Sequence, residues 1–484
     1  MITERDPTTT MKNVKLFALC ATLIALAPMD VRAQTTVSPT KVFDLAPYGT
    51  TTGRSMALCG PTKEGICYST ITSFGAQGST SAIYTTNGTS APFKVHDGQH
   101  ETNIEATDGN VIYHWSGSGF TGAYDFTFSA TNMVQAVAIL PVPPLLVLVP
   151  QHVTSAAKFD AQVVNGKLIC AMDQGMNVGV ELVSIPALGK PKTLVKDIDP
   201  GSPSGCVGGV EGSTCLLAGK MFFSAKTAAA GTELWTTDGT AAGTQQFSNF
   251  NTAAAPDFAV YKMVSIGSKI YLSASNVPGD NELWMSTAAP GSLTLLKDIN
   301  PGTAKGSSPS DFTIVGLNVY FVANDGTNGR ELWVTDGTAA GTRMVKDLRS
   351  GAGVGSEPEA LTLFKGQLHF FAKDNAGVLG LYRTDGTTAG TALCHVLGSP
   401  NYIARTYTTT ARLYYLQPGT KSTLWRTNGT AASLEKVLAS GHTTGAHPYL
   451  PTSIVTKGNT LYFTADYFGT GTSFWKIMDP TDRK

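Results

Sequence analysis

Four aspartates recur at one place in the sequence pattern, just after an apolar stretch, and their side chains are the ones most able to do chemistry. They are Asp173, Asp325, Asp374 and Asp466. If the fold brings them to one face, their carboxylates can form a binding surface, or an acid–base site that acts on a polymer near Asp325 and Asp374. The structural interpretation is that each carboxylate caps the turn of its own loop by accepting backbone N–H groups.

A second recurrent motif is Asp-Gly-Thr, found at Asp238, Asp336 and Asp385. A calcium loop supplies several oxygen ligands at alternating positions, whereas each of these segments has a single carboxylate. Asp accepts hydrogen bonds from amides two residues on and Gly adopts positive φ, so the motif predicts a hairpin turn. Asn87 and Asn428 replace Asp in two copies, which a turn tolerates better than a metal site. We therefore predict no metal site and no cofactor.

Catalytic motifs give no further lead. The chain has no Gly-x-Ser-x-Gly elbow, phosphate loop or dinucleotide fingerprint, so no catalytic residue is predicted. A site assembled from single residues of several repeats leaves no such motif. The sequence therefore leaves enzyme activity undecided but favours a protein without it.

Both aspartate motifs belong to a repeat of about 49 residues. The clearest copies run from Glu233 to Thr244 and from Glu331 to Thr342, each beginning with Glu-Leu-Trp and containing Asp-Gly-Thr. The position of the Trp recurs in nine units: Tyr84, Tyr124, Val183, Trp235, Trp284, Trp333, Tyr382, Trp425 and Trp475. A fixed period of this length predicts a stack of like structural units.

One unit is clearest between Glu359 and Gly398, where four short apolar stretches are separated by turn residues. The mature chain shows no helical periodicity, so these stretches predict β-strands. Four-stranded antiparallel units repeated at this length are typical of β-propeller blades, whose radial arrangement removes exposed sheet edges. We predict an all-β fold, a β-propeller with eight to nine blades for the nine units counted.

The two ends of the chain predict how the ring closes. The last unit stops at Met478-Asp479-Pro480, before a fourth strand. Near the N-terminus, residues 41–49 resemble the fourth strands at 194–201 and 296–302. We therefore predict that the N-terminal strand completes the last blade and closes the ring.

Residues 1–33 have the features of a secretory signal. Met11 and Lys12 give a positive start, residues 16–27 are apolar, and small residues mark a cleavage site near Ala33. Met11 is then the true start, and residues 34–484 form a single β-propeller domain. No stretch is long enough to span a bilayer. We expect a monomeric protein that is secreted, periplasmic or at the cell surface.

Charge argues against nucleic-acid binding. Lys plus Arg and Asp plus Glu are equal at 35 each, and charged residues make up only 14% of the chain. The composition therefore provides no basic stripe for a phosphate backbone.

Six cysteines follow the signal region, and export to an oxidising compartment favours disulfides between those close in sequence. The candidates are Cys59 with Cys67 and Cys206 with Cys215. Cys170 and Cys394 lie in apolar strands of different units and fit buried thiols better than a long-range bridge, although their pairing stays open.

The tryptophans of the repeat have apolar neighbours, which predicts that they pack between adjacent blades. The alternative is an exposed ring of aromatic side chains that stacks on sugars.

Residues 233–244 and 331–342 resemble the bacterial ELWxxDGT-repeat proteins, secreted or surface proteins also labelled hyalin-like. Residues 296–302 fit the usual continuation of that family. The match is specific from about residue 163 to residue 342 and poor before residue 128. The resemblance implies a repeat β-propeller in the cell envelope or medium, and no activity that can be assigned to named residues.

The sequence favours a binding or adhesion module at the cell envelope, whose glycan or protein ligand is held on the face that carries the four aspartates. One alternative is an extracellular polymer hydrolase or lyase with its site at the channel mouth. The other is a structural component of a surface assembly.

Overall fold

The computed structural model describes residues 162–479 with gaps, and strands only within residues 36–153. Besides four gaps of one or two residues, residues 162–479 lack 174–178, 187–192, 201–204, 207–213, 251–257, 399–402, 418–422, 438–453 and 466–472. The predicted signal region, 1–33, lies outside the described residues.

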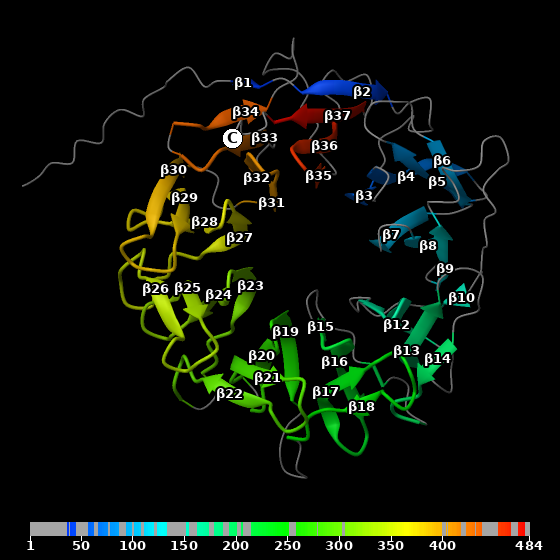
Figure 1. Ribbon diagram of the computed structural model, residues 1–484, viewed down its shortest axis with the longest axis horizontal. Coiled ribbons are helices and arrows are strands. Elements are labelled where there is room, and N and C mark those ends of the chain that lie inside the picture. Colours follow the sequence, from blue (N-terminus) through cyan, green and yellow to red (C-terminus); the bar gives the residue numbers. More distant parts are fainter. Residues whose placement is uncertain are drawn as a thin grey trace, which may run out of the picture.

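All regular elements of the described residues are β-strands, which form nine sheets. Figure 1 shows these sheets following one another in chain order around a central opening. The nine sheets match the nine repeat units, and each Trp-equivalent position of the repeat lies in the third strand of its sheet.

Five consecutive sheets each have four antiparallel strands in sequence order. Their strands are β11 (Gln162–Val164), β12 (Lys167–Asp173), β13 (Val180–Pro186) and β14 (Thr193–Lys196); β15 (Cys215–Leu217), β16 (Lys220–Thr227), β17 (Gly231–Thr237) and β18 (Gln245–Gln246); β19 (Ala259–Ile266), β20 (Lys269–Ser275), β21 (Glu282–Thr287) and β22 (Thr294–Lys297); β23 (Ser310–Val315), β24 (Asn318–Asn324), β25 (Arg330–Thr335) and β26 (Arg343–Lys346); β27 (Glu359–Phe364), β28 (Gln367–Lys373), β29 (Leu379–Thr384) and β30 (Ala392–Gly398).

Two N-terminal sheets have the same order. They consist of β3 (Ala57–Pro61), β4 (Ile66–Gly75), β5 (Gly78–Thr86) and β6 (Phe93–Gly98), and of β7 (Glu101–Thr107), β8 (Val111–Phe120), β9 (Ala123–Asn132) and β10 (His152–Val153).

The two C-terminal sheets take strands from the N-terminus. One contains β31 (Arg405–Thr408), β32 (Leu413–Gln417), β33 (Thr423–Thr427) and β34 (Glu435–Val437), with β1 (Thr36–Val37) added in parallel to β34. The other contains β35 (Ile454–Lys457), β36 (Thr460–Ala465), β37 (Ser473–Met478) and β2 (Thr40–Asp44).

Strand β2 supplies the fourth strand of the last sheet, as the sequence predicts. It runs antiparallel to β37, with Lys41 opposite Trp475 and Phe43 opposite Phe474. The register shifts by one residue beside Trp475, and the same shift occurs beside Trp333 where β25 meets β26. The N-terminal strand therefore occupies the slot that a consecutive fourth strand fills elsewhere.

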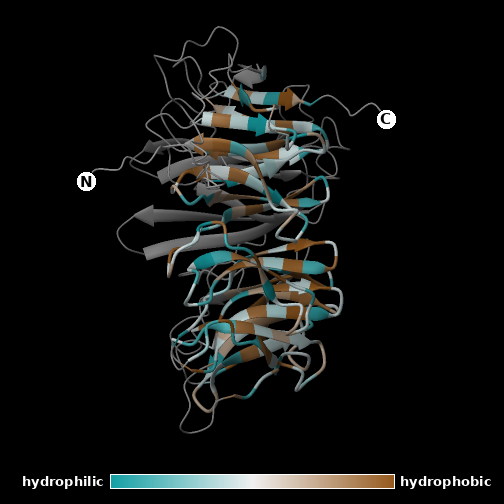
Figure 2. Ribbon diagram, turned by 90° about the vertical axis from the view of Figure 1, so that its left-hand side faces the viewer, coloured by the Kyte–Doolittle hydropathy of each residue, from teal (hydrophilic) through white to brown (hydrophobic). Residues whose placement is uncertain are grey.

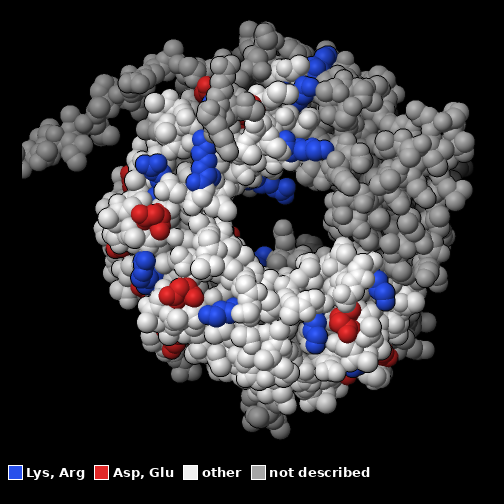
Figure 3. All heavy atoms as spheres, in the orientation of Figure 1, with Lys and Arg blue, Asp and Glu red and all other residues white. Residues whose placement is uncertain are grey.

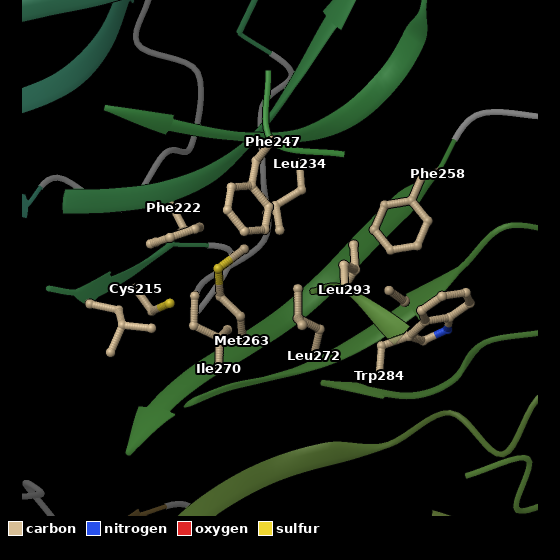
Figure 4. Close-up of a cluster of buried hydrophobic side chains, with 12 residues drawn as sticks. Cys215, Phe222, Leu234, Phe247, Phe258, Met263, Ile270, Leu272, Trp284 and Leu293 are labelled. Carbon is tan, nitrogen blue, oxygen red and sulfur yellow. The ribbon is translucent and has the colours of Figure 1, made fainter. Parts of the chain in front are cut away.

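Apolar side chains between neighbouring sheets form the core. In one cluster, Phe222 and Leu234 of the β15–β18 sheet meet Met263, Leu272 and Trp284 of the β19–β22 sheet (Figure 4). Figure 2 shows the apolar residues concentrated within the strands. Burying apolar surface in this way is the main favourable contribution to folding.

The repeated tryptophans belong to this core. Their exposed fractions are between 4% and 9%, at Trp235, Trp284, Trp333, Trp425 and Trp475. The predicted packing role is confirmed, and the alternative of an exposed aromatic ring for sugars is wrong for these residues.

The predicted disulfide between Cys206 and Cys215 is wrong. Both are buried free thiols. Cys206 packs with Ile198 of the preceding sheet, whereas Cys215 packs with Met263 of the following sheet. The two thiols are therefore separated because they fill different spaces between sheets.

The other cysteines have mixed outcomes. Cys170 and Cys394 are both buried and are not joined by a disulfide, as the sequence favours. Cys59 and Cys67 are register partners in β3 and β4, but their side chains lie outside the described residues, so that disulfide stays a prediction.

Candidate binding faces

Two of the four predicted aspartates, Asp325 and Asp374, lie in loops that join second to third strands. Asp325, after β24, accepts hydrogen bonds from Thr327 N (2.9 Å) and Asn328 N (2.7 Å). Asp374, after β28, accepts them from Ala376 N and Val378 N, both at 2.9 Å. Each carboxylate therefore orders its own loop, the structural role that the sequence offered as the alternative.

These loops share a face with the connections between sheets. Ser350 N, in the β26–β27 connection, donates to Asn375 Oδ1 at 2.8 Å, and Gly353 N donates to Thr327 O at 2.7 Å. We call this surface the loop face: the loops after the second and the fourth strand of each sheet.

The structure brings Asp325 and Asp374 to the loop face, where each carboxylate accepts hydrogen bonds within its own loop. The side chains of Asp173 and Asp466 lie outside the described residues. Burial raises the pKa of Asp325, but hydrogen bonds from Asn328 and Thr327 outweigh it and lower the pKa overall. Asp325 is therefore an ionised acceptor at neutral pH.

The Asp-Gly-Thr segments form the hairpin turns that the sequence predicts. Asp336 Oδ1 accepts from Thr338 N (2.8 Å) and Thr338 Oγ1 (2.7 Å). Asn428 Oδ1 makes the same two contacts with Thr430, at 2.9 and 2.7 Å. A β-carbon at Gly341, which follows the Asp-Gly-Thr segment, would overlap the Asp336 carboxylate. The turn therefore also needs a glycine at position 341.

The opposite surface carries the turns after the first and the third strand of each sheet, and we call it the turn face. Asn165 Nδ2, in the β11–β12 turn, donates to Asp238 O of the next sheet at 3.0 Å. Lys269 Nζ, at the β19–β20 turn, donates to Gly337 O of the next sheet at 3.3 Å. These two first turns are thereby held against the third turn of the next sheet.

Basic residues mark the first turns, a feature that the sequence analysis missed. Six of the seven first turns whose residues the structure describes carry one at the turn or beside it: Lys167, Lys220, Lys269, Lys365, Arg412 and Lys457. Figure 3 shows Lys and Arg side chains at the edge of the central opening. Equal totals of acidic and basic residues hid this arrangement, and only an alignment of the repeats reveals it.

Buried glutamates are a second feature that the sequence analysis missed. Glu331 is 0% exposed and accepts from Ser356 N (2.7 Å), Ser356 Oγ (2.6 Å) and Leu348 N (3.4 Å). It thereby ties the end of β26 and the following connection to β25. The sequence did contain a pattern that could have predicted these glutamates, because a charged residue recurs in the repeat directly before two apolar residues that are buried.

The same position is buried in three more sheets, at Glu181, Glu233 and Glu282. Burial raises the pKa of Glu331 to about 7, although hydrogen bonds from Ser356 oppose the shift. Burial likewise raises the pKa of Glu181 to about 7 against hydrogen bonds from Ile198 and Gly205. These acids belong to the interior of the fold and are not exposed on either face.

Neither a metal cluster nor a membrane helix is present among the described residues. No group of three or more His, Cys, Asp or Glu is placed to hold a metal ion there. In that same part of the chain, no helix has the length and apolar character needed to span a bilayer.

Of the comparisons with known proteins, the one with solved structures gave matches. No protein-family model and no curated protein matches it. Puromycin hydrolase is similar with a TM-score of 0.36 and 15% identity over 79% of this chain, which spans 62% of that protein. An uncharacterized protein from Listeria monocytogenes is similar with a TM-score of 0.33 and 10% identity, over 69% of this chain and 93% of that one. Neither likeness bears on the activity of this chain.

Proposed function

We propose that the chain is a secreted β-propeller of nine blades, closed by its N-terminal strand, and that it binds a glycan or a protein at the cell envelope. The proposal combines an architecture with a role, and each has its own support.

Strand contacts support the ring. The first strands of successive sheets touch from β15 through β19, β23, β27, β31 and β35 to β3 and β7, while β11 touches β16. The N-terminal segment joins two sheets, because β1 pairs with β34 and β2 with β37. A ring built in this way leaves only short and protected inner sheet edges.

The hydrogen-bonded frame of the loop face is the observation that carries the binding role. Gly306 N donates to Gly279 O at 2.9 Å, and Ser308 N donates to Asn281 O at 2.9 Å. These two bonds fix a connection to a loop of the sheet that it leaves, whereas the Ser350–Asn375 contact fixes a connection to a loop of the sheet that it enters. A surface ordered in advance loses less conformational entropy when it binds a ligand.

The hydrolase or lyase alternative receives less support from the described aspartates. Asp325 and Asp374 both hold their own loops, and the lowered pKa of Asp325 is unsuited to a general acid at neutral pH.

Retention on cell envelopes tests the proposed role. The chain from Gln34 onward should sediment with bacterial envelope fragments, and the heat-unfolded chain serves as the control. Periodate or protease treatment of the fragments then separates a glycan from a protein ligand. Release of sugar or peptide products with time would favour the enzyme, and no retention on any envelope would contradict the proposal.

A further inference from the structure

The turn face has a chemical character of its own. Each of its seven described first turns, taken with one flanking residue on either side, lacks Asp and Glu. Six carry Lys or Arg, and the seventh, between β23 and β24, presents Leu317. Six of these turns follow one another along the inner rim, because the first strands of their sheets are in contact. These strands are β15, β19, β23, β27, β31 and β35.

Exposed aliphatic side chains lie among these basic residues. Leu317 is 88% exposed at its turn. Leu216 and Leu363 occupy equivalent positions, one residue before the end of β15 and of β27, and are 39% and 46% exposed. Exposed apolar side chains grouped with charges mark surfaces that bind proteins.

We propose that the turn face binds an acidic segment of a partner protein, in which Asp or Glu alternates with aliphatic residues. This surface lies opposite the loop face that carries the binding role above, and the proposal goes beyond that role. The acidic side chains of the segment would lie against the lysines, while its aliphatic side chains would cover Leu216, Leu317 and Leu363.

A protein segment fits this face better than other anionic partners. Single-stranded nucleic acid binds through exposed aromatic platforms, and the only aromatic residue in these seven turns is Phe364, which is 2% exposed. A broad anionic surface such as a membrane would meet the carboxylates of Asp238, Asp336 and Asp385 on the same face. Glycan hydroxyls gain little from contact with leucine side chains.

Binding of defined probes tests the proposal. The main probe is a fluorescent peptide of alternating Glu and Leu, with a Glu–Ser peptide of equal length to isolate the aliphatic contribution. Polygalacturonate, oligothymidylate and anionic lipid vesicles represent the other partner classes. Fluorescence anisotropy or co-sedimentation gives each affinity at physiological salt.

Two variants of the turn face have matched controls on the loop face. Lys220→Glu with Lys365→Glu should weaken binding of the Glu–Leu peptide at least about tenfold, and Leu317→Ser should weaken it several-fold. Lys305→Glu and Val354→Ser change an exposed cation and an exposed aliphatic residue of the loop face, and both should bind the Glu–Leu peptide as tightly as the wild type does, whatever they do to retention on envelopes. Unchanged melting temperatures show that the variants fold.

The outcomes separate this proposal from the binding role itself. Tighter binding of polygalacturonate, oligothymidylate or vesicles than of the Glu–Leu peptide would overturn the partner class. Equal binding by all variants would overturn the assignment to the turn face. If no probe binds while envelopes still retain the protein, the proposal fails and the binding role stands; if envelopes do not retain it either, both fail.

Discussion

The β23–β26 sheet and the last sheet are secured by different means. In the β23–β26 sheet all four strands are consecutive, and Glu331 ties the following connection through Leu348 and Ser356. In the last sheet the fourth strand comes from the N-terminus, and Asp479, directly after β37, contacts the neighbouring sheet.

Asp479 is 1% exposed and accepts hydrogen bonds from Thr409 Oγ1 (2.5 Å), Tyr414 OH (2.8 Å) and Arg426 Nη1 (2.8 Å). Arg426 Nε also contacts Glu435 Oε2 at 2.6 Å. The repeat thus uses a buried acid that local amides and a hydroxyl satisfy, whereas the junction at the chain end uses a buried ion pair. Asp479 thereby ties the end of β37 to the preceding sheet.

Replacing a tryptophan should have the largest effect on the repeat. Trp333→Ala removes a side chain that is 7% exposed and should lower the free energy of unfolding by about 3 to 5 kcal/mol. Leu317→Ala, at a residue that is 88% exposed, is the control and should stay within about 0.5 kcal/mol. Chemical denaturation measures both, and equal stabilities would contradict the packing role.

Breaking the ion pair should have a slightly smaller effect at the chain-end junction. Asp479→Ala leaves Arg426 with Glu435 as its remaining partner, so we expect a loss of about 3 kcal/mol, the low end for removing one member of a buried pair. Adding Arg426→Met to this variant should restore part of the loss. If the single variant is as stable as the wild type, the junction does not depend on this network.

The buried glutamate predicts a pH dependence. The pKa of Glu331 is about 7 in the folded protein against 4.5 for the free side chain. Between these values the folded state holds a proton that the unfolded state lacks, so stability falls as pH rises from 4.5 to about 7 and then levels off. Glu331→Gln should reduce this loss of stability across the pH range by about 1 to 3 kcal/mol. Thermal melting at several pH values in this range measures it. An unchanged slope would show that Glu331 does not titrate in this window.

The smallest effect is expected at the Asp-Gly-Thr turn. Asp336→Asn should change stability by only a few tenths of a kcal/mol, because Asn428 already makes the same contacts in another sheet. Melting curves with and without calcium provide the measurement. A calcium-dependent shift that Asp336→Asn abolishes would restore the metal interpretation.

The sequence predicts the repeated part of the fold because each strand, turn and tryptophan recurs at a fixed spacing. It also predicts the place of β2, because the sequence of residues 41–44 resembles that of the fourth strands of other units. Features without a repeated signal could not be predicted. Asp479 and Arg426 are 53 residues apart, and the two residues of β1 have no distinctive pattern.

The candidate site was harder to predict than the fold. The sequence located Asp325 and Asp374 on loops, but hydrogen bonds within each loop decide their role, and spacing does not reveal these. Proximity in sequence also misled for Cys206 and Cys215, because the two thiols pack in different spaces between sheets.

Cross-linking β2 to β37 tests the central claim most directly. Thr40 and Lys476 are register partners, so a variant with Thr40→Cys and Lys476→Cys should form an intramolecular disulfide on mild oxidation, identified by mass spectrometry of the linked peptides, and should melt at a higher temperature. Shifting the first cysteine by one residue, to Lys41, should weaken the link to position 476. Intermolecular cross-links alone, or none, would contradict a ring closed by the N-terminal strand.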